Sequence, residues 1–299
     1  MRTVFMGTPA IAVPVLRRLA ALTTVTTVIT QPDRPAGRGN TLTPPPVKVA
    51  ALELGLPVWQ PESLKGLAAD PRLACDLAVV MAYGELLRQD VLDIPLHGCI
   101  NLHGSLLPRW RGASPLQAAI RAGDALTGVT VMRMVRGLDA GPMYLTETLP
   151  ITDQTTLATL HDDMAESAAL ALERFLAVWP PPEPQPQDDA QMTHCRKLTF
   201  DDGKLDPSNT ASELDRWVRA YTPAPGCWLP WADQRMRIHA VTPSGRTDLA
   251  PGALAVTERR LYLGCADAAL EITRLQSPGK PVMTTRDWLN GNKVPTHIG

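Results

Sequence analysis

An asparagine and a histidine stand two positions apart at the end of a short apolar run, Cys99–His103. On a β-strand, residues two apart point to the same face, so Asn101 and His103 would place an amide beside an imidazole. The amide can donate a hydrogen bond and the imidazole can move a proton. The same pair could also serve only the fold, with the histidine bonded to nearby backbone and the asparagine capping a turn.

An aspartate between two glycines is a second candidate. The sequence Gly137-Leu138-Asp139-Ala140-Gly141 follows a run of alternating residues. Glycines permit tight backbone paths and close approach of other groups. Asp139 could therefore take part in chemistry at a site, although aspartates that only shape a turn are far commoner than catalytic ones.

A long loop with spaced arginines is the third candidate. Residues 31–46 contain Pro, Gly and Arg without a helical or strand period. The loop could be merely solvated, or Arg34 and Arg38 could contact phosphates. The formal net charge of −1 argues against a strongly basic nucleic-acid binder, but residues 1–60 carry six basic side chains against two acidic ones.

Several other chemistries lack support in the sequence. Gly7-Thr8-Pro9 is not a dinucleotide-binding fingerprint, and no His, Cys and Asp residues have the spacing of metal ligands, so we expect no metal. The five cysteines form no CxxC pair, which favours reduced thiols over a disulfide framework. No apolar run is long enough to span a membrane, and the start lacks a signal-peptide pattern, so we expect a cytoplasmic protein.

Strand and helix patterns alternate in the first half of the chain and would position these residues. We expect strands at Thr3–Met6, Val25–Thr30, Asp76–Ala82, Cys99–His103 and Gly128–Val135, and helices at Ala10–Leu22, Val47–Leu54 and from Leu157 to Trp179. This alternation predicts an α/β fold with a doubly wound, mostly parallel, Rossmann-like sheet. Ligands bind at the carboxyl ends of the strands in such sheets, where Asn101 and His103 lie.

A proline-rich segment suggests a domain boundary. Residues 180–190 cannot continue a helix or a central strand, and we interpret them as a linker after a catalytic domain of residues 1–179. In residues 191–299 we expect one helix, Ser212–Tyr221, and short strands at Met236–Val241, Leu261–Cys265 and Ala269–Leu275. Short strands at this spacing favour a small, OB-like β-barrel.

Taken in order, several motifs closely resemble the methionyl-tRNA formyltransferase family. They are Met6-Gly7-Thr8-Pro9, the loop from Gln31 to Gly39, the block from Asn101 to Gly112, and Gly137 to Gly141. The resemblance implies a catalytic trio, a segment that contacts 10-formyltetrahydrofolate, and a basic loop that reaches the acceptor end of a tRNA. At the matching positions, the catalytic trio is Asn101, His103 and Asp139. The folate-contacting segment is Ser105, Leu106, Leu107 and Pro108, and the basic residues of the loop are Arg34 and Arg38.

The resemblance further implies an enzyme of translation initiation, transferring a formyl group to the α-amino group of methionine on initiator methionyl-tRNA. Its partners would be that tRNA, contacted also by the C-terminal domain, and the folate co-substrate, with the enzyme itself a monomer. Asn101 and a protonated His103 would donate hydrogen bonds to the oxyanion that forms when the amine attacks, while Asp139 positions the imidazole.

The chain departs from the family pattern at a few positions, and other functions remain open. Phe200 and Pro207 stand where the family often has Lys and Trp, which bears on tRNA contacts of the second domain. A formyltransferase acting on an amino-sugar nucleotide would share the trio but lack the arginine-bearing loop. A non-catalytic tRNA-binding protein on this scaffold is a further alternative, and it predicts loss of a trio member.

Overall fold

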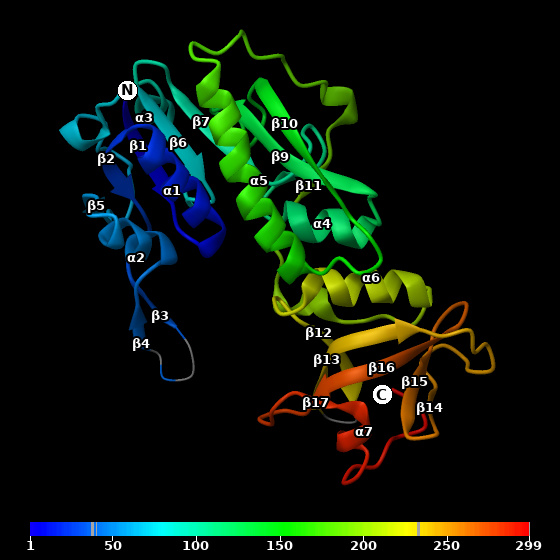
Figure 1. Ribbon diagram of the computed structural model, residues 1–299. Helices are drawn as coiled ribbons and strands as arrows, with labels where there is room; N and C mark the ends of the chain where they lie inside the picture. The colour runs from blue at the N-terminus through cyan, green and yellow to red at the C-terminus, as the bar shows by residue number, and fades with distance from the viewer. Residues whose placement is uncertain (37–38, 40, 232–233, 299) are drawn as a thin grey trace. The chain divides into compact units, whose positions relative to one another are not determined.

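The expected doubly wound sheet is present in the N-terminal unit of the computed structural model (Figure 1). The structure describes residues 1–36, 39, 41–231 and 234–298. These residues form two units, the first of which contains Met1–Pro115, Leu126–Pro150 and His161–Cys195. The second contains Leu116–Ala125, Ile151–Leu160 and the remainder from Arg196. Arg38 lies outside the described residues.

Among the described residues, seven strands form the main sheet in the order β10-β9-β7-β6-β1-β2-β5. Five of them are parallel: β1 (Arg2–Gly7), β2 (Thr24–Ile29), β5 (Val58–Trp59), β6 (Leu77–Met81) and β7 (Cys99–His103). The antiparallel pair β9 (Leu126–Arg133) and β10 (Met143–Pro150) completes the edge next to β7. All five residues of β6 are buried, as its continuous apolar sequence predicts for a strand covered on both faces.

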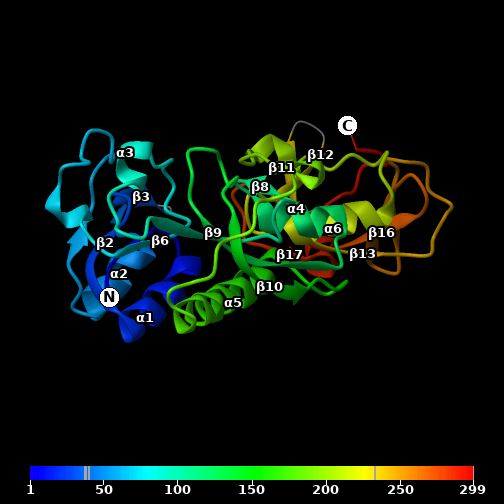
Figure 2. The same ribbon diagram turned by 90° about the horizontal axis from the view of Figure 1, so that it is seen from above.

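Helices cover both faces of this sheet. The helix predicted at Ala10–Leu22 is confirmed as a 3-10 turn, η1 (Ala10–Ala12), that leads into α1 (Val13–Leu22). Helices α1 and α5 (Leu157–Ala177) lie on one face, and α3 (Gln89–Leu92) lies on the other (Figure 2). Helix α2 (Pro46–Glu53) contacts α1, and η2 spans Pro71–Leu73.

Two segments differ from their sequence-based interpretation. The supposed loop 31–46 contains an antiparallel pair, β3 (Arg34–Ala36) and β4 (Thr41–Thr43), which is too short to show a period in the sequence. The proline-rich linker belongs to the first unit, because its backbone finds partners there. The backbone amide of Gln185 donates to the carbonyl of Met143, and the amide of Met143 donates to the carbonyl of Gln185. The strand β11 (His194–Cys195) pairs in parallel with β8 (Arg111–Gly112).

The second unit is β-rich, as expected. Its strands pair antiparallel in the order β12 (Cys227–Trp231), β13 (Gln234–Pro243), β16 (Ala269–Gln276), β15 (Arg260–Gly264) and β14 (Leu254–Thr257), with β17 (Met283–Thr284) beside β16. No strand pairing in the described part of the chain joins β14 back to β12. The unit also contains α4 from Leu116 (Pro115–Ala122), η4 (Phe200–Gly203), α6 (Ala211–Tyr221) and α7 (Thr285–Trp288); η3 (Asp189–Gln191) lies in the first unit.

A capping box fixes the start of α6. The Thr210 hydroxyl accepts a hydrogen bond from the backbone amide of Glu213, while the Glu213 carboxylate accepts one from the amide of Thr210. These bonds satisfy donors that a helix start leaves unpaired. Within the described residues, no helix has the length and apolar character needed to cross a bilayer.

Candidate active site

Asn101 and His103 lie at the carboxyl end of β7, an inner strand of the main sheet. Asn101 lies opposite Val80 of β6 on one side and Met132 of β9 on the other. The two-residue spacing places both side chains on one face of this inner strand, as the sequence predicts. The histidine side chain is buried, with 7% of its surface exposed.

The imidazole of His103 faces an oxygen on each side. Its Nε2 lies 2.9 Å from the carbonyl oxygen of Trp110, and its Nδ1 lies 3.6 Å from Oδ2 of Asp139. A carbonyl can only accept, so Nε2 carries a proton and donates it to Trp110. The Nδ1 distance exceeds a hydrogen bond, so Nδ1 remains open to a reacting group and forms an ion pair with Asp139 when it is protonated.

Asp139 reaches the histidine from the loop between β9 and β10. Its backbone has φ +49°, an unusual conformation for a residue with a side chain. Its carboxylate Oδ2 accepts a hydrogen bond of 2.9 Å from the amide of Gly112, and only 12% of the side chain is exposed. The structure therefore brings together a carboxylate and an imidazole that are 36 positions apart in the sequence.

The side chain of Asn101 completes this group. It is half-buried, and among the described residues it makes no hydrogen bond. Buried amides usually find partners inside the protein, whereas a half-buried amide can bond water. An amide without one, beside an imidazole, is available to a bound molecule as both donor and acceptor.

Residues 105–108 form a fixed turn after β7. The Ser105 hydroxyl donates to the carbonyl oxygen of Arg109, at 2.6 Å. The Thr130 hydroxyl donates to the carbonyl oxygen of Ser105 and accepts from the amide of Leu107. Ser105 and Leu107 are buried, whereas Leu106 and Pro108 are half-buried. Direct contact with a ligand would therefore come mainly from Leu106, Pro108 and the backbone of the turn.

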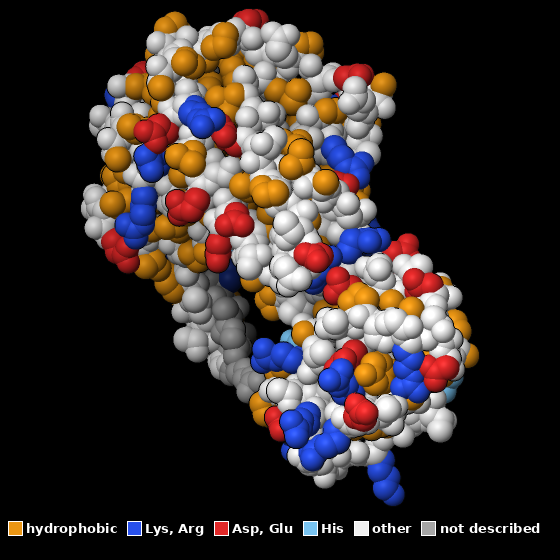
Figure 3. All heavy atoms as spheres, turned by 45° about the vertical axis from the view of Figure 1, so that its right-hand side comes forward, with side chains coloured by type: hydrophobic (Ala, Val, Ile, Leu, Met, Phe, Trp, Pro, Cys, Tyr) orange, Lys and Arg blue, Asp and Glu red, His pale blue; other side chains and the backbone are white. Residues whose placement is uncertain are grey.

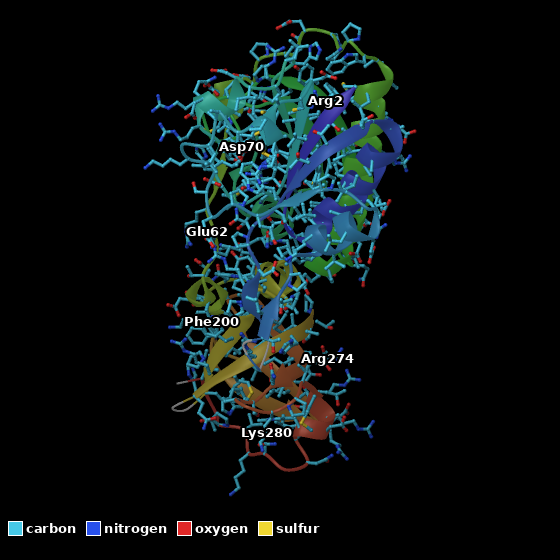
Figure 4. The ribbon with its side chains drawn as sticks, turned by 90° about the vertical axis from the view of Figure 1, so that its left-hand side faces the viewer. Arg2, Glu62, Asp70, Phe200, Arg274 and Lys280 are labelled. Atoms are coloured by element: carbon cyan, nitrogen blue, oxygen red, sulfur yellow. The ribbon has the colours of Figure 1, made fainter. Side chains whose placement is uncertain are left out.

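The base of the arginine-bearing loop is anchored by Asp33. Its carboxylate accepts hydrogen bonds from Lys48, at 2.7 and 2.8 Å, and from Gln60, at 2.8 Å. These bonds hold the pKa of Asp33 below its ordinary value. Arg34 is exposed and lies 3.5 Å from Glu62, a residue labelled in Figure 4. An exposed pair of this kind is worth little energetically, so the guanidinium can exchange its partner for a phosphate.

The sequence did not reveal the residues that hold this group in place. Gly112 has φ +119°, and a side-chain carbon there would overlap the carbonyl oxygen of Cys195. A side-chain carbon at Gly141 would likewise overlap the carbonyl oxygen of Arg133. Gly112 ends the Asn101–Gly112 block, so its position was a usable signal. Arg111 lies in the same block, whereas Gln187, in the proline-rich segment, carried no such signal.

A cluster of aromatic and basic side chains lies on the second unit. The rings of Phe200 and Trp228 are stacked, with an interplanar angle of 2° and centroids 5.9 Å apart. The guanidinium of Arg235 lies 4.5 Å from the Trp228 ring, and that of Arg237 lies 5.3 Å from the Phe200 ring. Figure 4 labels Phe200, and Figure 3 shows that basic side chains on this unit are interspersed with acidic ones.

Comparison with known proteins decides the family. The formyl transferase model matches residues 1–176, and the model for the formyl transferase C-terminal domain matches residues 197–293. A methionyl-tRNA formyltransferase from Rhizorhabdus wittichii is 45% identical over 99% of this chain and 96% of its own length. The chain belongs to the methionyl-tRNA formyltransferase family.

Solved structures share the fold of this family member at much lower sequence identity. An N-formyltransferase from Helicobacter canadensis, in complex with folinic acid and dTDP-3-aminofucose, has a TM-score of 0.70 at 15% identity. That match covers 90% of this chain and 97% of the other. HypX from Aquifex aeolicus in complex with tetrahydrofolic acid has a TM-score of 0.61 at 18% identity, covering 97% of this chain and 47% of the other. The methionyl-tRNA formyltransferase match is thus much nearer in sequence than these two.

Proposed function

We propose that this protein transfers a formyl group from 10-formyltetrahydrofolate to the α-amino group of methionine on initiator methionyl-tRNA, for translation initiation. The substrate assignment rests on relatives such as the Rhizorhabdus wittichii enzyme, which matches along nearly the whole chain. The observation that carries the chemistry is the approach of the Asp139 carboxylate to the His103 imidazole, 3.6 Å apart, at the end of the strand that also carries Asn101.

We assign proton transfer to His103, with Asp139 as its charge partner. The attacking ammonium must lose a proton before its nitrogen can form a bond, and Nδ1 of His103 is the ring nitrogen left open to receive it. The nearby Asp139 carboxylate stabilises the resulting imidazolium, because opposite charges 3.6 Å apart in a buried site attract strongly. Nδ1 can then give this proton to the leaving nitrogen, while the attacking nitrogen, positively charged once its bond to carbon has formed, releases its second proton to solvent.

Charge stabilisation falls to Asn101. The co-substrate supplies the formyl carbon that the amine attacks, and negative charge develops on the formyl oxygen. The Asn101 amide is free of internal hydrogen bonds in the described structure and can donate to that oxygen without breaking one. Such a preorganised donor stabilises the transition state more than the ground state.

The folate co-substrate fits the residues that are present. An unpartnered amide at Asn101 and half-buried Leu106 and Pro108 offer a polar group beside apolar surface, as ligand sites commonly do. HypX from Aquifex aeolicus, which has this fold, was solved with tetrahydrofolic acid. We assign Ser105, Leu106, Leu107 and Pro108 to folate contact, with the Ser105 and Leu107 side chains acting through the turn that they stabilise.

Two regions would contact the tRNA. Arg34, and with it Arg38, would meet phosphates near the acceptor end from the loop that Asp33 anchors. In the second unit, half-buried Phe200 is stacked on buried Trp228, and Arg235 and Arg237 add positive charge beside it. We assign Phe200, which replaces a lysine common in the family, to contact with the RNA through its partly exposed ring.

A direct transfer assay tests this function. Purified protein is incubated with 10-formyltetrahydrofolate and charged initiator tRNA, and formyl-methionine is measured by mass spectrometry after the ester is hydrolysed. We expect formyl-methionine with the wild type and none without the folate. Transfer only to a dTDP-amino sugar would identify a sugar formyltransferase, and tRNA binding without any transfer would identify a non-catalytic protein.

A further inference from the structure

We infer that Gln187 is a positioning residue for Asp139, and that residues 185–195 form a strap that fixes the proton-handling geometry of the site. This inference rests on the proposed function. All the residues involved belong to the N-terminal unit. The strap lies in and just beyond the segment that the sequence indicated to be a linker.

The amide of Gln187 holds the backbone on both sides of Asp139. Its Nε2 donates to the carbonyl oxygen of Asp139 at 2.8 Å and to that of Gly141 at 2.7 Å. A residue at φ +49° keeps that backbone conformation only where its surroundings enforce it. Gln187 supplies that enforcement from 48 positions away in the sequence.

Arg111 orients the Gln187 amide. The guanidinium Nε of Arg111 donates to Oε1 of Gln187 at 2.9 Å, which directs the amide nitrogen toward the two carbonyls. The Arg111 side chain is only 6% exposed, and its other end bonds Asp189 at 2.7 Å. A rotated amide would face donors with donors and acceptors with acceptors, so a single orientation satisfies every group.

The backbone next to Arg111 contacts both candidate catalytic side chains. The carbonyl of Trp110 accepts from His103 Nε2, and the amide of Gly112 donates to the Asp139 carboxylate. The strap in turn holds this backbone, since the Arg111 amide donates to the carbonyl of Thr193. The strap therefore connects to the imidazole through one short segment and to the carboxylate through Gln187.

Two substitutions of Gln187 distinguish positioning of Asp139 from mere attachment of the strap to Arg111. Q187L removes every hydrogen bond of the amide. Q187E keeps an oxygen facing Arg111, and even adds a charge there, but loses the donor to the two carbonyls. Attachment of the strap alone would survive Q187E, whereas positioning of Asp139 would not. Q185L is the matched control, because Gln185 is exposed on the same strap and bonds Met143 only through its backbone.

The test combines kinetics with hydrogen exchange. In Q187E and Q187L we expect kcat to fall at least about tenfold, the KM for methionyl-tRNA to stay within about twofold, and amide exchange in residues 137–142 to accelerate. Q185L should match the wild type in all three. A Q187E variant with wild-type kcat or wild-type exchange would overturn the inference. If the wild type itself formylates no tRNA, the proposed function fails, and the exchange comparison still decides whether Gln187 holds the Asp139 loop.

Discussion

Replacing Asn101 by alanine should separate catalysis from stability. The wild-type side chain makes no hydrogen bond among the described residues and is only half-buried, so its removal leaves no internal partner unsatisfied. The free energy of unfolding should therefore fall by less than about 1 kcal/mol. The loss of one donor to the developing oxyanion should raise the barrier by about 3–4 kcal/mol, which lowers kcat by roughly 10²–10³.

The assay for this variant measures both quantities on the same preparation. Steady-state formyl transfer gives kcat, and urea unfolding followed by circular dichroism gives the free energy of unfolding. N209A is a suitable control, because the Asn209 side chain donates to the carbonyl of Asp206, at 2.9 Å, in the second unit. It should keep wild-type kcat. An N101A variant that retains a third of wild-type kcat, or that loses stability in proportion to activity, would refute the reasoning.

Three further predictions follow from the contacts described. Arg34→Ala should raise the KM for methionyl-tRNA and make the log–log dependence of binding on salt shallower by about 1, and an unchanged slope would exclude a phosphate contact. Gly112→Ala should lower the free energy of unfolding in urea by more than about 2 kcal/mol, because it combines φ +119° with overlap on the Cys195 carbonyl. The control G245A has open space around the added carbon and should lower it by less than about 1 kcal/mol. Equal decreases in the two variants would contradict this explanation. Burial raises the pKa of Cys99 and Cys227 to about 12, so their contribution to stability is complete below about pH 9 and is lost as pH rises toward 12. The free energy of unfolding in urea should therefore be lower at pH 10 than at pH 8. A C99A/C227A variant in which this decrease is as large as in the wild type would argue against this cause.

The sequence predicted the elements that local pattern determines. The range of β7 is confirmed at Cys99–His103, and the long amphipathic helix is confirmed as α5, ending two residues before Trp179. Continuous apolar runs and helical periodicity are short-range signals, so they survive without knowledge of the fold. Asn101 and His103 both lie on the confirmed strand, where residues two positions apart face the same way.

The sequence could not predict contacts that depend on distant segments. Gln187 looks like one polar residue in a proline-rich stretch, and only the fold shows that its amide bonds the backbone of Asp139 and Gly141. The partner of Arg111 is 76 positions away. Composition correctly indicated no α-helix or central strand in residues 180–190, where only the start of the 3-10 turn η3 (Asp189–Gln191) is helical, but such a segment can still be held through its side chains and isolated backbone bonds.

Single-turnover formylation by the wild type and by His103→Ala tests the central claim most directly. Each protein, in excess over the charged initiator tRNA, is mixed separately with that tRNA and saturating 10-formyltetrahydrofolate. The amount of formyl-methionyl-tRNA is then followed with time. We expect product from the wild type and a rate at least about 10²-fold lower for H103A, with the circular dichroism spectrum unchanged. A folded H103A variant that forms formyl-methionyl-tRNA within about threefold of the wild-type rate would contradict it.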